Sequence, residues 1–74
     1  MKKFSVIIAH RHATSISLEE EFYYVLTALA KEEQIPLNQL ITQIDRTRTI
    51  DNLSSALRLY VLRKLLQKIK ITLK

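Results

Sequence analysis

Hydrophobic and polar positions alternate near the start of the chain and then change to a helical period. Over residues 13–18 the side chains point to opposite sides of an extended strand. One side carries Thr14, Ile16 and Leu18, and the other carries Ala13, Ser15 and Ser17 together with Arg11. Such a strand needs a partner, because its backbone donors and acceptors are otherwise unpaired. In so small a chain this pattern predicts pairing with a second copy.

The preceding stretch, residues 3–9, reads KFSVIIA and is apolar and β-branched. It is typical of a strand, or of an arm that covers the core of a partner. Residues 9–12 interrupt it, so that either two short strands or one bent strand would fit. The chain has no glycine to mark a tight hairpin. We therefore predict a continuous extended arm over residues 3–17.

A helix is predicted over residues 18–33. Ser17 and Glu20 have the spacing of a capping box. Glu19, Glu20 and Glu21 lie at the positive end of the helix dipole and are interpreted as helix stabilisers rather than catalytic acids. The apolar positions follow a period of 3.6 residues, and they are Leu18, Phe22, Val25, Leu26, Leu29 and Ala30.

A second helix is predicted over residues 36–46, after Pro36 ends the first. Ile35 precedes it and is a poor N-cap residue. The first backbone amides, near Leu37 and Asn38, are therefore suited to bind an anion, typically phosphate. The alternative is that water satisfies them.

A third helix is predicted over residues 53–68, with Asp51 or Asn52 as its N-cap. Two faces of this helix are apolar. One comprises Leu53, Ala56, Leu57, Tyr60, Val61 and Leu65, and the other comprises Leu59, Leu62, Leu66 and Ile69. One face can pack on the other helices, and the other face needs a further surface, which a second subunit would provide. We find no internal repeat and predict a single domain over residues 1–74.

Composition and charge narrow the class of protein. The 74 residues are 47% hydrophobic, with no cysteine and a net charge of +5. A core of this size is marginal alone, and oligomerisation enlarges it. Acidic residues gather in the first helix, whereas no acidic residue follows Asp51. This segregation favours a polyanionic partner, although a solvated basic face is the simpler alternative.

Catalytic and cofactor chemistry is not indicated. Without glycine there is no phosphate loop or dinucleotide fingerprint, and no nucleophile elbow accompanies the serines. His10 and His12 form a weak candidate for a metal site. Tyr23 and Tyr24 are interpreted as packing residues rather than base-stacking platforms. We expect no enzyme activity, cofactor, bound metal or membrane span, and a cytoplasmic location.

The order of strand, helix, short turn and helix resembles that of the ribbon-helix-helix DNA-binding proteins, the group that includes Arc and MetJ. The chain is more specifically similar to a small bacterial subfamily with a Thr-Ser-x-x-Leu-Glu start and a Ser-Ala-Leu-Arg motif in a third helix. The matching residues here are Thr14–Glu19 and Ser54–Arg58. Two positions depart from the subfamily: Ser17 replaces a long basic residue, and Gln34 replaces a glycine that ends the first helix.

The resemblance implies a mainly α fold with a short β-ribbon, formed by an intertwined homodimer with an intersubunit antiparallel ribbon. The ribbon would enter the major groove of double-stranded DNA, and the second helix would hold a phosphate. The expected DNA-binding residues are Lys3, Arg11, Ala13, Ser15, Ser17, Leu37 and Asn38. The expected dimer interface is Thr14, Ile16, Leu18, Phe22, Leu57 and Val61.

The predicted function is therefore DNA binding and transcriptional regulation. Ala13, Ser15 and Ser17 are short and offer no bidentate base contact. The alternative is a ribbon-helix-helix dimer that acts as a protein-interaction or assembly module without sequence-specific DNA binding.

Overall fold

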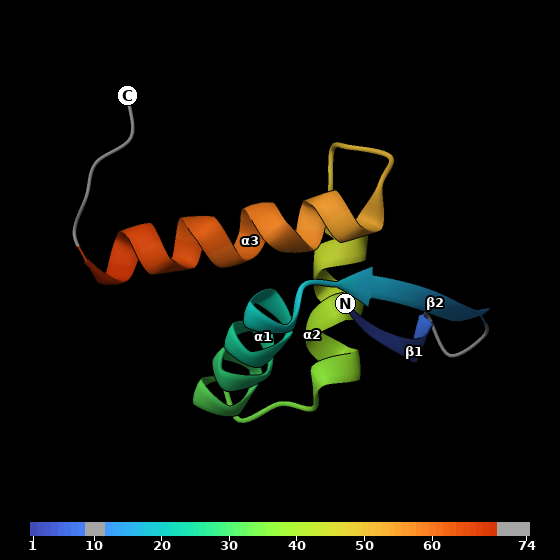
Figure 1. The fold of residues 1–74 in the computed structure, drawn as a ribbon, viewed down its shortest axis with the longest axis horizontal. Coiled ribbons are helices and arrows are strands. Elements are labelled where there is room, and N and C mark those ends of the chain that lie inside the picture. The colour runs from blue at the N-terminus through green and yellow to red at the C-terminus, as the bar shows by residue number, and fades with distance from the viewer. Residues whose placement is uncertain (9–11, 70–74) are drawn as a thin grey trace.

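A computed structural model describes residues 1–8 and 12–69, in which two antiparallel strands are followed by three helices (Figure 1). The elements are β1 (Lys2–Ile8), β2 (His12–Leu18), α1 (Glu20–Glu32), α2 (Leu37–Thr47) and α3 (Leu53–Lys68). The strand pair lies at one side of the helices, and α3 crosses them and extends beyond them. The predicted class, mainly α with a short β-ribbon, is confirmed.

The N-terminal segment is not the continuous arm that we predicted. β1 and β2 pair with each other within one chain, in a register that runs from Lys2 opposite Leu18 to Ile8 opposite His12. The pairing satisfies backbone groups on both strands. It also places the apolar side of each strand on the same face, against the helices: Phe4, Val6 and Ile8 from β1, and Thr14, Ile16 and Leu18 from β2. Residues 9–11, which connect the two strands in the sequence, lie outside the described residues.

The boundary between β2 and α1 also differs from the prediction. Ser17 and Leu18 are still paired with β1, so the chain remains extended at these positions. Helix α1 begins at Glu20 with Glu19 as its N-cap, and no side chain caps it. The predicted capping box between Ser17 and Glu20 is therefore wrong, because strand pairing holds Ser17 in the sheet.

Helix α1 ends in a Schellman motif centred on Gln34. This residue has a φ of 60°, in the left-handed region that favours glycine. The Gln34 amide donates to the carbonyl of Lys31 at 2.9 Å, and the Ile35 amide donates to the carbonyl of Ala30 at 3.0 Å. This geometry explains why a glycine would suit the position that Gln34 occupies. Pro36 then serves as the N-cap of α2 rather than as its first helical residue.

The core is formed by one face of the strand pair and by all three helices. Leu18, Leu26, Leu40, Ile41 and Leu57 are among its almost fully buried side chains. Burying a side chain of this size contributes roughly 1.5–3 kcal/mol. Helix α3 therefore belongs to the core and is not an appendage to a two-helix domain.

This packing buries most of the residues that are predicted to form a dimer interface. Ile16, Leu18, Leu57 and Val61 are between 0% and 3% exposed in a single chain. Thr14 and Phe22 are half-buried. Four of the six predicted interface residues thus expose almost no surface in a single chain, because β2 and α3 pack together in its core.

Helix α3 has two apolar faces, as predicted, but Leu65 lies on the exposed face rather than on the core face, and Leu66 is half-buried. The Asn52 side chain caps it by accepting a hydrogen bond from the Ser55 amide at 3.0 Å. Ala56, Leu57 and Val61 are buried. The other face carries a row of exposed apolar side chains, which we call the α3 row: Leu59, Leu62, Leu65 and Ile69. Within the described part of the chain, no helix is long and apolar enough to cross a membrane.

Candidate nucleic-acid interface

The face of the strand pair that points away from the helices gathers six side chains. Residues directly opposite each other in a ladder share a face, and the register pairs Lys3 with Ser17, Ser5 with Ser15 and Ile7 with Ala13. We call this set the outer face. Ser17 is half-buried and the other five are exposed. Ser5 and Ile7 were missed in the sequence, because their place on this face depends on the intrachain register.

The structure also shows which backbone groups point away from the strand pair. The amide and carbonyl of Ile7 both bond to the side chain of Asn38, so they point away from β2. Along an antiparallel strand, residues whose amide and carbonyl point toward the partner strand alternate with residues whose amide and carbonyl point away from it. Two residues that lie opposite each other both point toward the other strand or both point away. Ala13 is opposite Ile7. The amides and carbonyls of Ala13, Ser15 and Ser17 therefore point outward from the far edge of β2.

Asn38 joins the start of α2 to the edge of β1. Its side-chain nitrogen donates to the carbonyl of Ile7 at 2.7 Å, and its side-chain oxygen accepts from the amide of Ile7 at 2.6 Å. The side-chain amide thus imitates a neighbouring strand and blocks the edge of β1 at this position. Asn38 thus closes the edge of β1 at Ile7, whereas no hydrogen bond among the described residues closes the edge of β2.

The first turn of α2 was predicted to offer backbone amides to a phosphate. No side chain caps this helix. The amides of Gln39 and Leu40 donate to the carbonyl of Pro36 at 3.0 and 3.1 Å. Among the described residues, the amides of Leu37 and Asn38 have no hydrogen-bond acceptor. They lie at the positive end of an 11-residue helix, next to the β1 edge.

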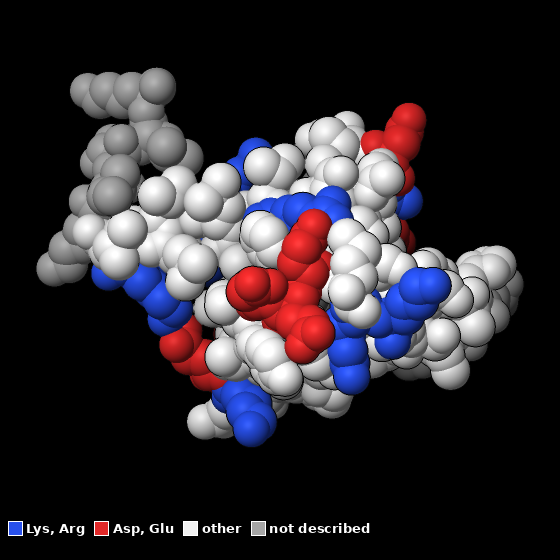
Figure 2. Space-filling model, in the orientation of Figure 1, with Lys and Arg blue, Asp and Glu red and all other residues white. Residues whose placement is uncertain are grey.

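The basic residues divide into those that are paired and those that are not. The Arg58 guanidinium bonds to the Glu19 carboxylate at 2.8 Å, and the Lys68 ammonium contacts the Glu32 carboxylate at 2.6 Å. The Arg58 hydrogen bond, with a backbone hydrogen bond, lowers the pKa of Glu19 below its ordinary value. Part of the positive charge of α3 is thus balanced by α1, and Figure 2 shows acidic side chains lying between basic ones on this side of the molecule.

The strands carry basic charge of their own. Lys3 is exposed on the outer face, and Lys2 lies with its ammonium 5.3 Å from the centre of the Tyr23 ring. Tyr23 also packs edge-on against Phe4, with 4.9 Å between ring centres. Arg11 and His10 lie outside the described residues, and His12 is exposed at the start of β2.

Comparison with known proteins identifies one family. The family described as "Ribbon-helix-helix domain" matches residues 1–65, which include both strands and most of α3. No curated protein and no solved structure matches the chain.

Proposed function

The chain belongs to the ribbon-helix-helix family, and we propose on this basis that it binds double-stranded DNA as a homodimer and regulates transcription. The family's fold is typically that of DNA-binding regulators. The observation that carries the proposal is the edge of β2. Its outward backbone groups belong to Ala13, Ser15 and Ser17, the same three residues whose side chains stand on the outer face.

In the proposed dimer, the β2 strands of two chains pair antiparallel about a two-fold axis at Ser15. Ser15 then faces the partner's Ser15, and Ala13 faces the partner's Ser17. These are the residues whose amides and carbonyls point outward, so every one of them finds a backbone partner. Self-pairing on one patch is the usual arrangement of a two-fold dimer. The buried residues Leu18 and Leu57 stay in the core of each chain, and the interface is the strand edge.

Such a dimer has a sheet of four strands in the order β1, β2, β2, β1. Neighbouring strands are about 4.8 Å apart, so the outer strands are about 14 Å apart. The major groove of DNA is about 12 Å wide and admits two strands. The two β2 strands therefore face the groove, while each β1 strand lies toward a flanking phosphate backbone, where Lys3 is placed to neutralise charge.

The proposed DNA contacts divide into two kinds. Lys3 and the free amides of Leu37 and Asn38 would bind phosphates and set the position of the dimer. Ser15 and Ser17 would meet base edges, and their short hydroxyls offer single contacts rather than the bidentate ones that discriminate strongly. We expect DNA binding with modest sequence preference and a strong dependence on salt.

The substitution Ser15→Pro tests this proposal, because proline removes one outward amide and leaves the β1–β2 hydrogen bonds in place. We expect Ser15→Pro to keep its circular dichroism spectrum, to sediment as a monomer and to bind a mixed duplex pool at least about tenfold more weakly. The matched control is Ser15→Ala, which retains the amide and should remain dimeric. A Ser15→Pro protein that is still a dimer would contradict edge pairing, and a wild-type dimer that binds no duplex at low salt would contradict DNA binding.

The α3 row favours a second candidate function, that of a protein-interaction or assembly module. Leu62 and Ile69 are 48% and 62% exposed, and Leu59 and Leu65 accompany them on the same helix. Exposed apolar patches of this kind often mark protein contacts. This function predicts assemblies larger than a dimer in sedimentation, which Leu62→Asn with Leu65→Asn should abolish without weakening DNA binding. If the wild-type protein never forms assemblies larger than a dimer, this second function is contradicted.

A further inference from the structure

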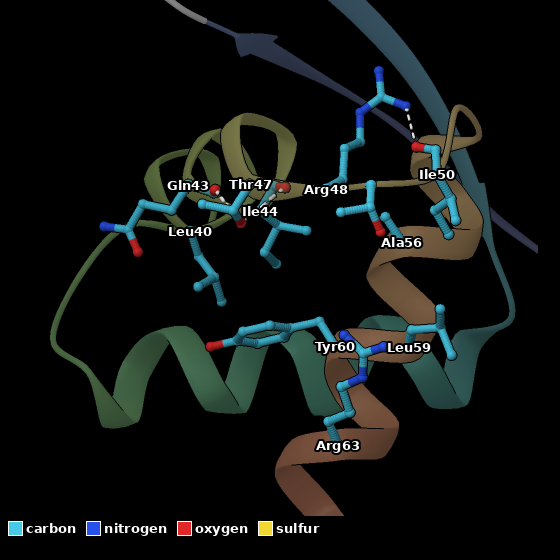
Figure 3. Close-up of a pocket in the computed structure, with 11 residues that line it drawn as sticks. Leu40, Gln43, Ile44, Thr47, Arg48, Ile50, Ala56, Leu59, Tyr60 and Arg63 are labelled. Carbon is cyan, nitrogen blue, oxygen red and sulfur yellow. Dashed lines mark hydrogen bonds between the residues drawn. The ribbon is translucent and has the colours of Figure 1, made fainter.

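A cavity of about 350 Å³ lies between the second half of α2, the connector that follows it and the first half of α3 (Figure 3). If each water occupies about 30 Å³, this volume corresponds to about a dozen water molecules. It falls at the small end of the range of about 300–1,000 Å³ that is typical of ligand sites. The cavity lies between the helices, apart from the outer face of the strands.

The cavity has an apolar floor. Leu40, Ile44 and Ala56 line it and are 1%, 6% and 7% exposed. Ile50 and the ring of Tyr60 also line the cavity, and Figure 3 shows the ring on the opposite side from Leu40. The Tyr60 hydroxyl points out of the cavity and donates to the Glu33 carboxylate at 2.9 Å, so that Tyr60 offers its ring rather than its polar end. The body of a matching ligand is therefore apolar.

Charge at the rim has a single sign. Two arginines, Arg48 and Arg63, line the cavity, and no acidic residue does. Arg48 is occupied: its Nε donates to Asp45 at 2.9 Å, and its Nη1 donates to the carbonyl of Ile50 at 2.9 Å and to that of Asp51. These bonds hold the connector in place.

Arg63 is different. Within residues 1–8 and 12–69, no hydrogen bond or ion pair involves its guanidinium. Figure 3 shows this side chain rising from α3 toward the cavity, beside Tyr60 and Leu59. A guanidinium with free donors binds a carboxylate in a bidentate manner. The neutral groups of Gln43 and Thr49 also line the cavity and add no competing charge.

We propose that this cavity binds a small amphipathic carboxylate, with an aromatic or branched apolar body on the Leu40–Ile44–Ala56 floor and its carboxylate on Arg63. The proposal does not depend on DNA binding or on the dimer, because all the lining residues belong to one chain. A cationic ligand of the same shape would meet Arg63, which has no ion pair among the described residues, whereas the neighbouring carboxylates of Asp45 and Glu33 are already bonded to Arg48 and Tyr60. The site therefore selects by charge as well as by shape.

Three probes of similar shape test the proposal: phenylacetate, phenylacetamide and phenethylamine. Each is titrated at millimolar concentration into the full chain, without DNA, and followed by amide chemical shifts in proton–nitrogen NMR spectra. We expect phenylacetate to shift amides around Leu40, Ile44 and Ala56, and to bind at least about tenfold more tightly than the amide or the amine. Equal binding of the three probes, no shift with any of them, or shifts confined to the α3 row would overturn the proposal.

Arg63→Gln identifies the residue that recognises the carboxylate. It should weaken phenylacetate binding about tenfold, which corresponds to about 1.4 kcal/mol, and leave phenylacetamide binding unchanged. The matched control is Arg46→Gln, which removes an exposed cation of α2 that does not line the cavity. If Arg46→Gln weakens phenylacetate binding as much as Arg63→Gln does, the attraction is general and the proposed site is wrong.

Discussion

The side chain of Asn38 forms two hydrogen bonds with the backbone of a single residue, Ile7, at 2.6 and 2.7 Å. Thirty-one positions separate the two residues in the sequence. The contact fixes α2 to β1 and blocks the edge of β1 at Ile7. The direction of the Ile7 backbone also determines that Ala13, Ser15 and Ser17 carry the open edge.

Replacing Asn38 tests the importance of this contact for stability. Asn38→Ala removes two exposed hydrogen bonds, and we expect the free energy of unfolding in urea to fall by about 1–2 kcal/mol. The Ile7 amide should also exchange with solvent faster. Gln39→Ala, a change at the exposed neighbouring position, should alter stability by less than about 0.5 kcal/mol. Equal effects of the two changes would show that the Asn38 bonds contribute nothing.

The end of α1 offers a stabilising substitution. Gln34 has a φ of 60°, which is unfavourable for a residue with a Cβ atom by about 1 kcal/mol or more. Gln34→Gly should therefore raise the free energy of unfolding by about 0.5–1 kcal/mol, after allowance for the greater freedom of glycine in the unfolded chain. Gln34→Ala retains the Cβ atom and should give no such gain. Thermal and urea unfolding of the three proteins measure the difference.

The ion pair of Glu19 with Arg58 makes the free energy of unfolding depend on pH in the acid range. The Arg58 hydrogen bond lowers the pKa of Glu19 in the folded state below its ordinary value of 4.5. Near that pH the unfolded chain binds more protons, so stability rises with pH there. The contribution is present above pH 4.5 and is lost as the pH falls through the lower, folded-state pKa.

Urea unfolding between neutral and acid pH measures this effect. In Arg58→Gln the decline of stability below pH 4.5 should become shallower, because Glu19 then loses the cation that favours its charged form. Arg46→Gln serves as the control, since no ion pair of Arg46 occurs among the described residues. An unchanged acid profile in Arg58→Gln would contradict the role of this pair.

Tyr60 is expected to make the free energy of unfolding fall as the pH rises in the alkaline range. Burial, together with the hydrogen bond to Glu33, raises the pKa of Tyr60 from 10.0 to about 12. Between these values the unfolded chain binds fewer protons than the folded chain, so stability falls as the pH rises from 10 toward 12. Tyr60→Phe should flatten this alkaline decline. The difference in tyrosinate absorbance between wild type and Tyr60→Phe should titrate near pH 12; a midpoint near 10 would contradict the raised pKa.

The sequence predicted the bounds of the helices with different accuracy. Residues 53–68 are predicted and observed as a helix with the same bounds, because Asn52 is a strong N-cap and the apolar period is continuous. Helix α1 begins two residues later than predicted, since strand pairing competes with the capping box for Ser17. The left-handed conformation of Gln34 was indicated only by comparison with a glycine position in the resembling subfamily.

Only part of the candidate interface could be predicted from the sequence. The alternation over residues 13–18 correctly separates the outer side chains from those that meet the core. Ser5 and Ile7 could not be assigned to the same face, because that requires the register between the strands. Leu57 and Val61 are buried within a single chain, which their periodicity could not show, because an apolar period does not tell whether the surface that covers it belongs to the same chain or to another.

Local periodicity, together with caps such as Asn52, was enough to assign the helical segments and the apolar side of each strand. The tertiary structure decided which strand pairs with which and which edge stays open. Backbone amides and carbonyls are chemically the same at almost every residue, so the partner of a strand is selected by packing over long sequence separations. The contact of Asn38 with Ile7 and the burial of Leu18 and Leu57 in one core are examples of such long-range interactions.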